Sequence, residues 1–258
     1  MTGFFIKKSF FDGWDNLISL VVLNLGYLLV LLTFYGAFEL FQVATIPALL
    51  LVIIAFAFNS LYSALVSYQT QVYVKGSKEG FHYFIGGIKL LYKHAILHFI
   101  LSILSGSIII FVIPFYLSYG SPFTFILAVI IFWVLLLVLL GLLYYYPLAI
   151  RMNQDSPLKT AKKALLIVAD NIWFSLFLAI YQIVLFVITI FFATIMPGIA
   201  GLALSRQVAI TLLMLKYDYL EEHPQTKKNE IPWDELLYDE RDKIGHRSLR
   251  SLIFPWKD

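Results

Sequence analysis

Two long apolar runs separated by a short turn limit what this chain can fold into more than any other feature of its sequence. The first run ends at Tyr119, the turn is Gly120-Ser121-Pro122, and the second run meets no charged residue before Arg151. A helix needs about 20 apolar residues to cross the hydrocarbon core of a bilayer. Each run is long enough, so the pair predicts a helical hairpin that enters and leaves a membrane on the same side.

The composition of the whole chain agrees with this interpretation. Hydrophobic residues make up 60% and charged residues 14% of the sequence, whereas charged residues account for about a quarter of a soluble domain. The sequence therefore predicts an all-α, polytopic membrane protein with six transmembrane helices. The first span lacks a cleavage site after it and is interpreted as retained, not as a signal peptide. The expected spans are 16–38, 46–67, 95–118, 122–147, 172–196 and 197–217.

The distribution of lysine and arginine predicts the orientation in the membrane. They lie before the first span, between the second and third, between the fourth and fifth, and from Lys216 onward, with Arg206 as the exception. The turns 39–45, 119–121 and 194–198 contain none. Because basic residues accumulate in short cytoplasmic loops, both termini are expected in the cytoplasm, which requires an even number of spans.

Two sets of residues recur at nearly constant intervals along the chain. Each return span opens near a proline, and these prolines are 75 residues apart: Pro47, Pro122 and Pro197. Each junction between an amphipathic segment and its outward span carries a polar residue: Asn16, His94 and Asn171. We infer three tandem helical hairpins, each preceded by an interfacial amphipathic helix and packed together as a pseudo-threefold bundle. The units are about 8–67, 86–147 and 163–217.

The segments outside the spans have amphipathic patterns. The first 15 residues and both long basic loops combine lysines with apolar residues at helical spacing, as in helices that lie along the inner leaflet. The composition changes at Glu221, so the chain divides into a membrane domain, 1–220, and a cytoplasmic amphipathic tail, 221–258. We expect the tail to pack on its own bundle, to lie on the membrane, or to dock on a partner. Its candidate docking residues are Trp233, Arg247, Leu249, Leu252 and Trp256.

Arg206 lies near the middle of the last expected span, nine residues after Pro197. An arginine at that depth costs roughly 2.5–3.5 kcal/mol on insertion scales and usually faces a bundle interior or a cavity. No acidic residue is expected at the same depth, so its partners are neutral side chains or backbone carbonyls. Either these groups satisfy Arg206 structurally, or it binds an anionic ligand such as a phosphate, a carboxylate or a lipid headgroup. The neutral candidates are Asn24, Asn59 and Gln182.

The outward spans carry further polar residues, among them His94 and His98 one helical turn apart. Small and polar side chains serve helix packing in membranes, and they also line polar pathways. His98 is therefore a second candidate for ligand binding. The histidine pair lacks an intervening acid and a third ligand, and the chain has no cysteine, so we expect no metal site and no cofactor.

Other classes of chemistry have no motif in this sequence. The spans contain no nucleophile beside a base, no paired carboxylates and no glycine-rich phosphate loop, so we expect a protein that is not an enzyme. The net charge of +3 is too small and dispersed to indicate nucleic-acid binding. The partner that the sequence indicates directly is the lipid bilayer, and a homo-oligomer is compatible with the pattern.

The opening span, Asp15–Leu29, carries an asparagine followed by leucine and an aromatic residue, and Gly80–Lys89 places Phe81 and Phe84 in the first basic loop. These two segments resemble the YesL-like family, bacterial membrane proteins grouped under a domain of unknown function. The resemblance covers about residues 4–215. It implies location in the bacterial cytoplasmic membrane and an accessory or regulatory role beside carbohydrate ABC transporters, and it carries no catalytic residues. The alternative is a small transporter, or a protein that binds an anionic solute or lipid at Arg206.

Overall fold

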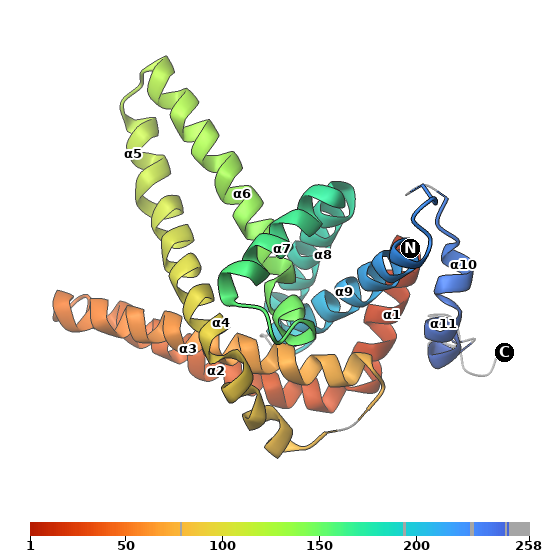
Figure 1. Ribbon diagram of the computed structural model, residues 1–258. Helices are drawn as coiled ribbons and strands as arrows, with labels where there is room; N and C mark the ends of the chain where they lie inside the picture. Colours follow the sequence, from red (N-terminus) through yellow and green to blue (C-terminus); the bar gives the residue numbers. More distant parts are fainter. Residues whose placement is uncertain (78, 193–194, 228–229, 246, 248–258) are drawn as a thin grey trace.

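The computed structural model of the protein describes residues 1–77, 79–192, 195–227, 230–245 and 247, and every regular element among them is a helix (Figure 1). Three hairpins follow one another along the chain. The first has α1 before it, the third has α7 before it, and a short tail closes the chain. The bounds are α1 Thr2–Asp15, α2 Leu17–Leu40, α3 Thr45–Val74, α4 Phe81–Ser107, η1 Ile108–Val112, α5 Ile113–Ser118, α6 Pro122–Arg151, α7 Pro157–Asp170, α8 Ile172–Phe191, α9 Gly198–Glu222, α10 Trp233–Leu236 and α11 Tyr238–Ile244.

Six helical stretches in the described chain are long and apolar enough to cross a membrane. Each contains most of one of the six spans expected from the sequence, although the third begins at His82 and not at 95, and the protein is an all-α, multi-pass membrane protein. The three prolines lie where the return helices begin, Pro47 in the first turn of α3, Pro122 at the first residue of α6 and Pro197 just before α9. The stretches are Leu17–Leu40, Thr45–Val74, His82–Ser118, Pro122–Arg151, Ile172–Phe191 and Gly198–Glu222.

The junctions between amphipathic helices and outward spans are not all alike. At Asn16 and Asn171 the helix breaks, and each side-chain amide donates to the carbonyl four residues earlier, at 2.9 and 3.0 Å. No break occurs at His94, where α4 continues from the amphipathic segment into the span. The His94 ring instead contacts the Thr160 hydroxyl at 3.3 Å. An imidazole does not offer the short amide donor that stabilises the other two breaks, so the interfacial helix expected before the third span is the first part of α4.

The helices contact one another in a cyclic order. The return helices α3, α6 and α9 meet in the centre, and each outward helix packs on its own return helix and on the return helix of the preceding hairpin. In the same order, α4 lies along α3, α7 along α6 and α1 along α9. Three tandem units around a common axis would produce this order of contacts. The repeat itself stays a prediction.

The first two hairpins converge at one end of their length and separate at the other, whereas the turn of the third lies against α2, where Asn24 donates to the carbonyls of Ile195 and Pro197. Figure 1 shows the turn of α2–α3 and the turn of α5–α6 pointing away from each other. Buried residues of α3 and α6 concentrate in their last halves, whereas α9 is buried over most of its length. In the most apolar window, 72% of α9 residues are buried against at most 28% in the other spans. We call the converging end the base and the three turns, 41–44, 119–121 and 192–197, the tips.

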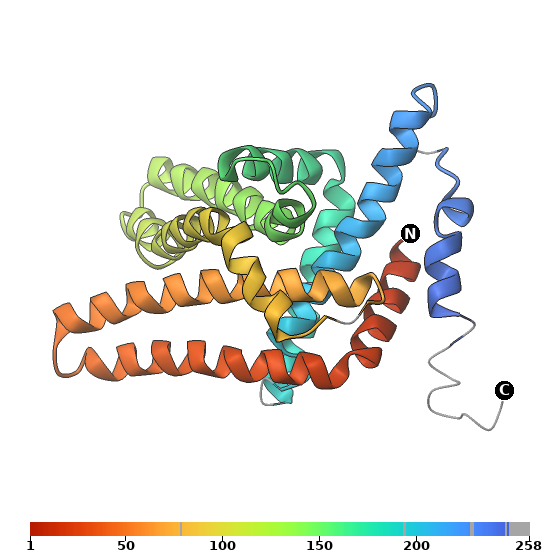
Figure 2. The same ribbon diagram turned by 60° about the horizontal axis from the view of Figure 1, so that its bottom comes forward.

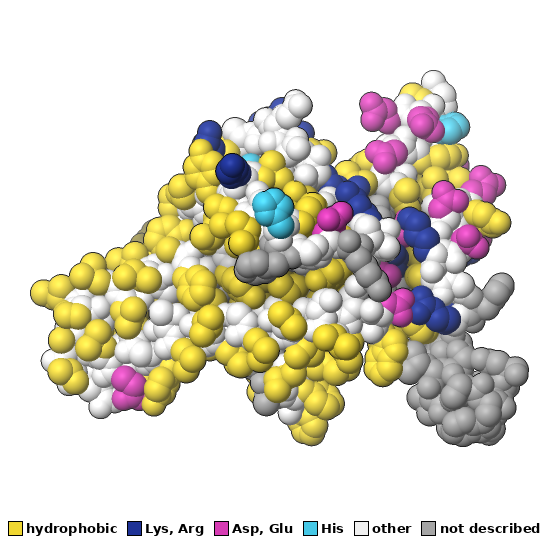
Figure 3. All heavy atoms as spheres, turned by 90° about the horizontal axis from the view of Figure 1, so that it is seen from below, with side chains coloured by type: hydrophobic (Ala, Val, Ile, Leu, Met, Phe, Trp, Pro, Cys, Tyr) yellow, Lys and Arg dark blue, Asp and Glu magenta, His cyan; other side chains and the backbone are white. Residues whose placement is uncertain are grey.

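The surface of the hairpins differs in polarity from the surface of the base. Figure 3 shows a continuous apolar surface over the hairpins and charged side chains gathered over the helix ends and the tail. Exposed lysines on the loops and amphipathic helices of the base form what we call the basic face. They are Lys75, Lys89, Lys93, Lys159 and Lys162.

The described part of the tail packs on α1 of its own chain (Figure 2). Lys8 is fully buried between Asp12 at 3.0 Å and Glu240 of α11 at 2.9 Å. Arg247 pairs with Asp15 at 2.7 Å and lies over the ring of Phe11. Trp233 is half-buried against the main core. Of the docking candidates, Trp233 and Arg247 therefore contact the bundle, and Leu249, Leu252 and Trp256 lie outside the described residues.

Asp12 makes the contact between α1 and the tail sensitive to pH. Burial raises the pKa of Asp12 to about 6 even though Lys8 opposes the shift. Because the folded pKa exceeds the unfolded one, the ionised carboxylate destabilises the fold above about pH 6, and protonation relieves this as the pH falls. The protein is expected to gain roughly 1 kcal/mol of stability from this group between pH 7.5 and pH 5.

Equilibrium unfolding of the detergent-solubilised protein at the two pH values measures this gain. Asp12→Asn should lack it, while Asp15→Asn, which changes a half-exposed carboxylate on the same helix, should keep it. An equal pH dependence in Asp12→Asn and the unchanged protein would contradict the assignment.

Candidate functional site

Polar side chains from all six spans meet near the centre, where α3, α6 and α9 come together. Most are buried, while the side chains of His98 and Arg206 are only half-buried. A polar group surrounded by hydrocarbon must find partners inside the protein, so convergence of the helices is where such groups are tolerated. We call the set the central polar cluster, and its members are Tyr27, Ser60, His98, Tyr146, Gln182 and Arg206.

Helix α3 connects one side of this cluster through Ser60 and its neighbour Ser63. The Tyr146 hydroxyl donates to the Ser60 carbonyl at 2.6 Å, and the Ser60 hydroxyl lies 3.0 Å from Nδ1 of His98. One turn away, the Tyr27 hydroxyl donates to Ser63 at 3.1 Å. These bonds hold α2, α4 and α6 against α3. Nε2 of His98 makes no hydrogen bond with any part of the chain that the structure describes.

Arg206 and Gln182 form the other side of the cluster. Nε of Arg206 donates to Oε1 of Gln182 at 3.1 Å, and the Gln182 amide donates to the Ser205 hydroxyl at 2.6 Å. Gln182 is therefore the neutral partner of Arg206, one of the three side chains expected from the sequence. Within the described ranges, the two terminal nitrogens of Arg206 make no hydrogen bond and no carboxylate forms an ion pair with it. Gln207, the next residue of α9, donates to the carbonyl and the hydroxyl of Ser67 on α3 at 2.8 and 3.0 Å, which joins this side of the cluster to α3.

Asn24 lies outside the cluster and has a structural role. Its amide donates to the carbonyls of Ile195 and Pro197 at 2.9 and 3.0 Å and accepts from the backbone N–H of Ala200 at 2.8 Å. Gly198 faces it with φ +69°, and a Cβ there would overlap the Asn24 side chain. Asn24 thus ties α2 to the tip between α8 and α9, and both of its amide hydrogens are already used.

The sequence identified half of the cluster. Arg206, Gln182 and His98 come together, whereas Asn24 binds the tip and Asn59, half-buried on α3, makes no side-chain hydrogen bond in the described chain. Tyr27, Ser60 and Tyr146 were missed. Tyr146 belongs to the run Tyr144-Tyr145-Tyr146, which resembles an aromatic anchor at a span end, and all three residues are nearly fully buried. The signal was the adjacency of the three tyrosines, because they cannot all face lipid from one helix.

No metal centre is assembled from the described residues, where no three His, Cys, Asp or Glu side chains lie close enough to hold an ion. His94 and His98 have separate partners, because His94 contacts Thr160 of α7 and His98 contacts Ser60 of α3. The chemistry available in the cluster is therefore hydrogen bonding by neutral groups around one guanidinium.

Comparison with known proteins adds no assignment. No protein-family model, no curated protein and no solved structure matches the chain.

The contact between Gln182 and Arg206 predicts a non-additive effect on stability. Gln182→Leu removes the acceptor and leaves a cation unpaired inside the bundle, so we expect a loss of about 2–3 kcal/mol. Adding Arg206→Leu removes that cation, and the double variant should recover at least about 1 kcal/mol of the loss. Equilibrium unfolding of both single variants and the double variant in mixed micelles gives the coupling energy. Purely additive effects would show that the two side chains act independently.

Proposed function

We propose that the protein is a non-enzymatic membrane protein that binds an anionic group in the central polar cluster, with Arg206 supplying the charge. The observation that carries the proposal is the state of the guanidinium. Among the described residues, one of its three nitrogens is hydrogen-bonded, the other two have no protein partner and no carboxylate pairs with it, although the side chain is half-buried between membrane-spanning helices. A buried cation normally has a counter-charge. An anion binding to the free edge would supply one through charge-assisted hydrogen bonds.

The neutral members of the cluster suit such a ligand. Nε2 of His98 makes no hydrogen bond within the described chain, while the serine hydroxyls of Ser60 and Ser102 lie at Nδ1. A neutral ring that carries its proton on Nε2 donates to an anion without adding a second fixed charge, and Gln182 holds the guanidinium in place through Nε. His98 and Arg206 are the half-buried members of the cluster. The anion's source is either a dissolved solute or a lipid headgroup.

The test uses one variant that removes the charge of Arg206 and a second that keeps Arg206 but places a carboxylate beside it. Thermal unfolding is measured in detergent with added phosphate or glucose 6-phosphate for solutes, and with phosphatidylglycerol in the micelles for headgroups. One of these is expected to raise the melting temperature of the unchanged protein. In Arg206→Gln, the same rise in melting temperature should require at least a tenfold higher concentration of the anion. Gln182→Glu should show the same increase, because it places a carboxylate against Nε while conserving side-chain size.

The control is Arg151→Gln, which removes the other arginine of the spans, a side chain bound to Thr211 at 2.7 Å at the base. It should leave the anion effect unchanged. Stabilisation by the same anion in Arg206→Gln and Gln182→Glu would refute the proposal. A large loss of stability in Arg206→Gln with no anion effect in any form of the protein would assign Arg206 a structural role.

A second candidate is an accessory or regulatory subunit of a carbohydrate ABC transporter in the bacterial cytoplasmic membrane. It rests on the resemblance to the YesL-like family, and one structural observation favours a protein partner within the membrane. Only 6% of the most apolar window of His82–Ser118 is buried inside the chain. The proposal places the basic face and both termini in the cytoplasm, and three tandem hairpin units would surround the central helices.

This second proposal predicts co-purification. Affinity purification from native membranes in mild detergent, followed by mass spectrometry, should recover permease or ATPase subunits in a fixed ratio to the protein. A chain that ends at Pro224 lacks the tail and tests whether the tail is needed. Recovery of the protein alone from native membranes would contradict the accessory role and would leave the anion proposal untouched.

A further inference from the structure

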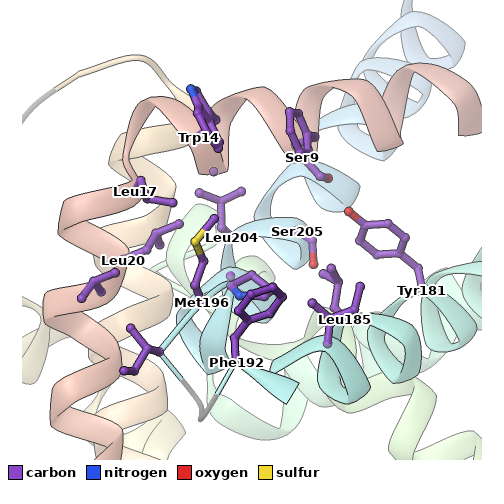
Figure 4. Close-up of a pocket in the computed structure, with 17 residues that line it drawn as sticks. Ser9, Trp14, Leu17, Leu20, Tyr181, Leu185, Phe192, Met196, Leu204 and Ser205 are labelled. Carbon is purple, nitrogen blue, oxygen red and sulfur yellow. The ribbon is translucent and has the colours of Figure 1, made fainter. Parts of the chain in front are cut away.

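An apolar cavity of about 230 Å³ lies between α1, α2, α8 and α9, and Arg206 is not among its lining residues. Figure 4 shows side chains of all four helices directed into it, with Trp14 from α1, Leu20 from α2, Leu185 from α8 and Leu204 from α9. We propose that this cavity binds one hydrocarbon chain of a membrane lipid. The proposal is independent of the anion proposal, because none of its lining residues contacts the free edge of the guanidinium.

The shape of the cavity suits a slim ligand. Its volume lies below the range of about 300–1,000 Å³ typical of sites for bulkier small molecules. It follows α8 from Tyr181 to Ile188, a distance of about 10 Å at the rise of an α-helix. An acyl chain is long, narrow and unbranched, so its shape matches such a space.

The lining chemistry favours an apolar occupant. Apart from Ser9, Tyr181 and Ser205, every lining residue is apolar or glycine. The Ser205 hydroxyl is already bonded to Gln182 and to the carbonyl of Leu202. Among the described residues the buried Ser9 hydroxyl has no hydrogen-bond partner, so it is a free polar atom in this lining. An apolar cavity of this kind does not hold ordered water. It therefore stays empty or takes up hydrocarbon.

The position of the cavity gives it a source of hydrocarbon. Three membrane-spanning helices and the amphipathic helix α1 line it, together with Phe192, Ile195, Met196 and Pro197 between α8 and α9. Phe10 and Trp14 of α1 line the cavity and are 37% and 44% exposed, so they form its rim. A tryptophan on an amphipathic helix marks the depth of the lipid headgroups. A lipid with its headgroup beside Trp14 has its chain at the level of the cavity.

Gly13 of α1 is the residue that keeps this space open. A Cβ at Gly13 would have only Leu20 within 4 Å, at 3.9 Å, so a larger side chain there would extend into the cavity without meeting backbone. Glycine lowers the stability of a helix relative to almost any other residue. Its presence at the cavity wall, within an otherwise continuous helix, fits a position where a side chain would displace a ligand.

The experiment counts retained phospholipid by native mass spectrometry after purification in dodecyl maltoside. The unchanged protein should carry one phospholipid-mass adduct. Gly13→Leu fills the cavity and should reduce the adduct at least fivefold. Gly3→Leu makes the same substitution in the same helix, where nothing lies within 4 Å of the added Cβ, and should retain it. Val21→Phe, from α2, is a second filling variant that should also lose the adduct.

Size-exclusion chromatography and circular dichroism establish that each variant is folded, and Val21→Phe decides the question if Gly13→Leu is not. Absence of the adduct from the unchanged protein overturns the proposal. An adduct of detergent mass in place of phospholipid overturns it as well. Equal retention in a folded filling variant and in Gly3→Leu does the same, because the lipid then lies elsewhere on the apolar surface. The anion proposal survives each of these outcomes, since its readout is the response to added anions.

Discussion

The structure depends on one constraint, which is that polar groups surrounded by hydrocarbon must bond to the protein itself because water is absent. The six spans obey it by bringing their polar side chains to the place where the return helices meet. Tyr146 and His98 converge on Ser60 of α3, and Gln182 of α8 accepts the Nε hydrogen of Arg206. The same constraint explains why α9, which carries the arginine, is the most buried of the six spans.

Helix α9 also separates two environments of opposite character. One side presents Arg206 to the central polar cluster, and the other presents Leu204 and Ser205 to the apolar cavity under α1. Gln182 spans the two sides, because its carbonyl oxygen receives Arg206 while its amide hydrogen bonds to Ser205. The spacing of α8 and α9 thus fixes both the orientation of the guanidinium and the width of the cavity. The proposed anion site and the proposed hydrocarbon site therefore both depend on α9.

Outside the membrane, electrostatic pairs take over the role that hydrogen bonds play in the spans. Lys8 is fully buried at the base and reaches Asp12 of its own helix and Glu240 of α11. Desolvating a lysine is costly unless it is paired with hydrogen-bonding carboxylates. The two acids meet this requirement, and the described tail is thereby joined to α1 and to the side of the bundle where α1 contacts α9. Burial raises the pKa of Asp12, so the charged form of this carboxylate is the one that the arrangement destabilises.

The sequence by itself determined the number of spans and their approximate positions, because hydrophobicity and length are local properties. It also placed the prolines that open the return helices and the lysines of the basic face, since these depend on the hydrogen bonds of a helix end and on charge. Only the tertiary structure shows which helices lie beside one another, and the contacts of individual side chains depend on that. Asn24 binds a turn more than 170 residues away, Tyr146 turned out to be a core residue, and α4 continues through His94. Of the candidate site, Arg206, His98 and Gln182 were found from depth and polarity alone. Tyr27 and Ser60 were not, because a tyrosine or a serine in a span faces lipid, protein or ligand according to which helix lies beside it.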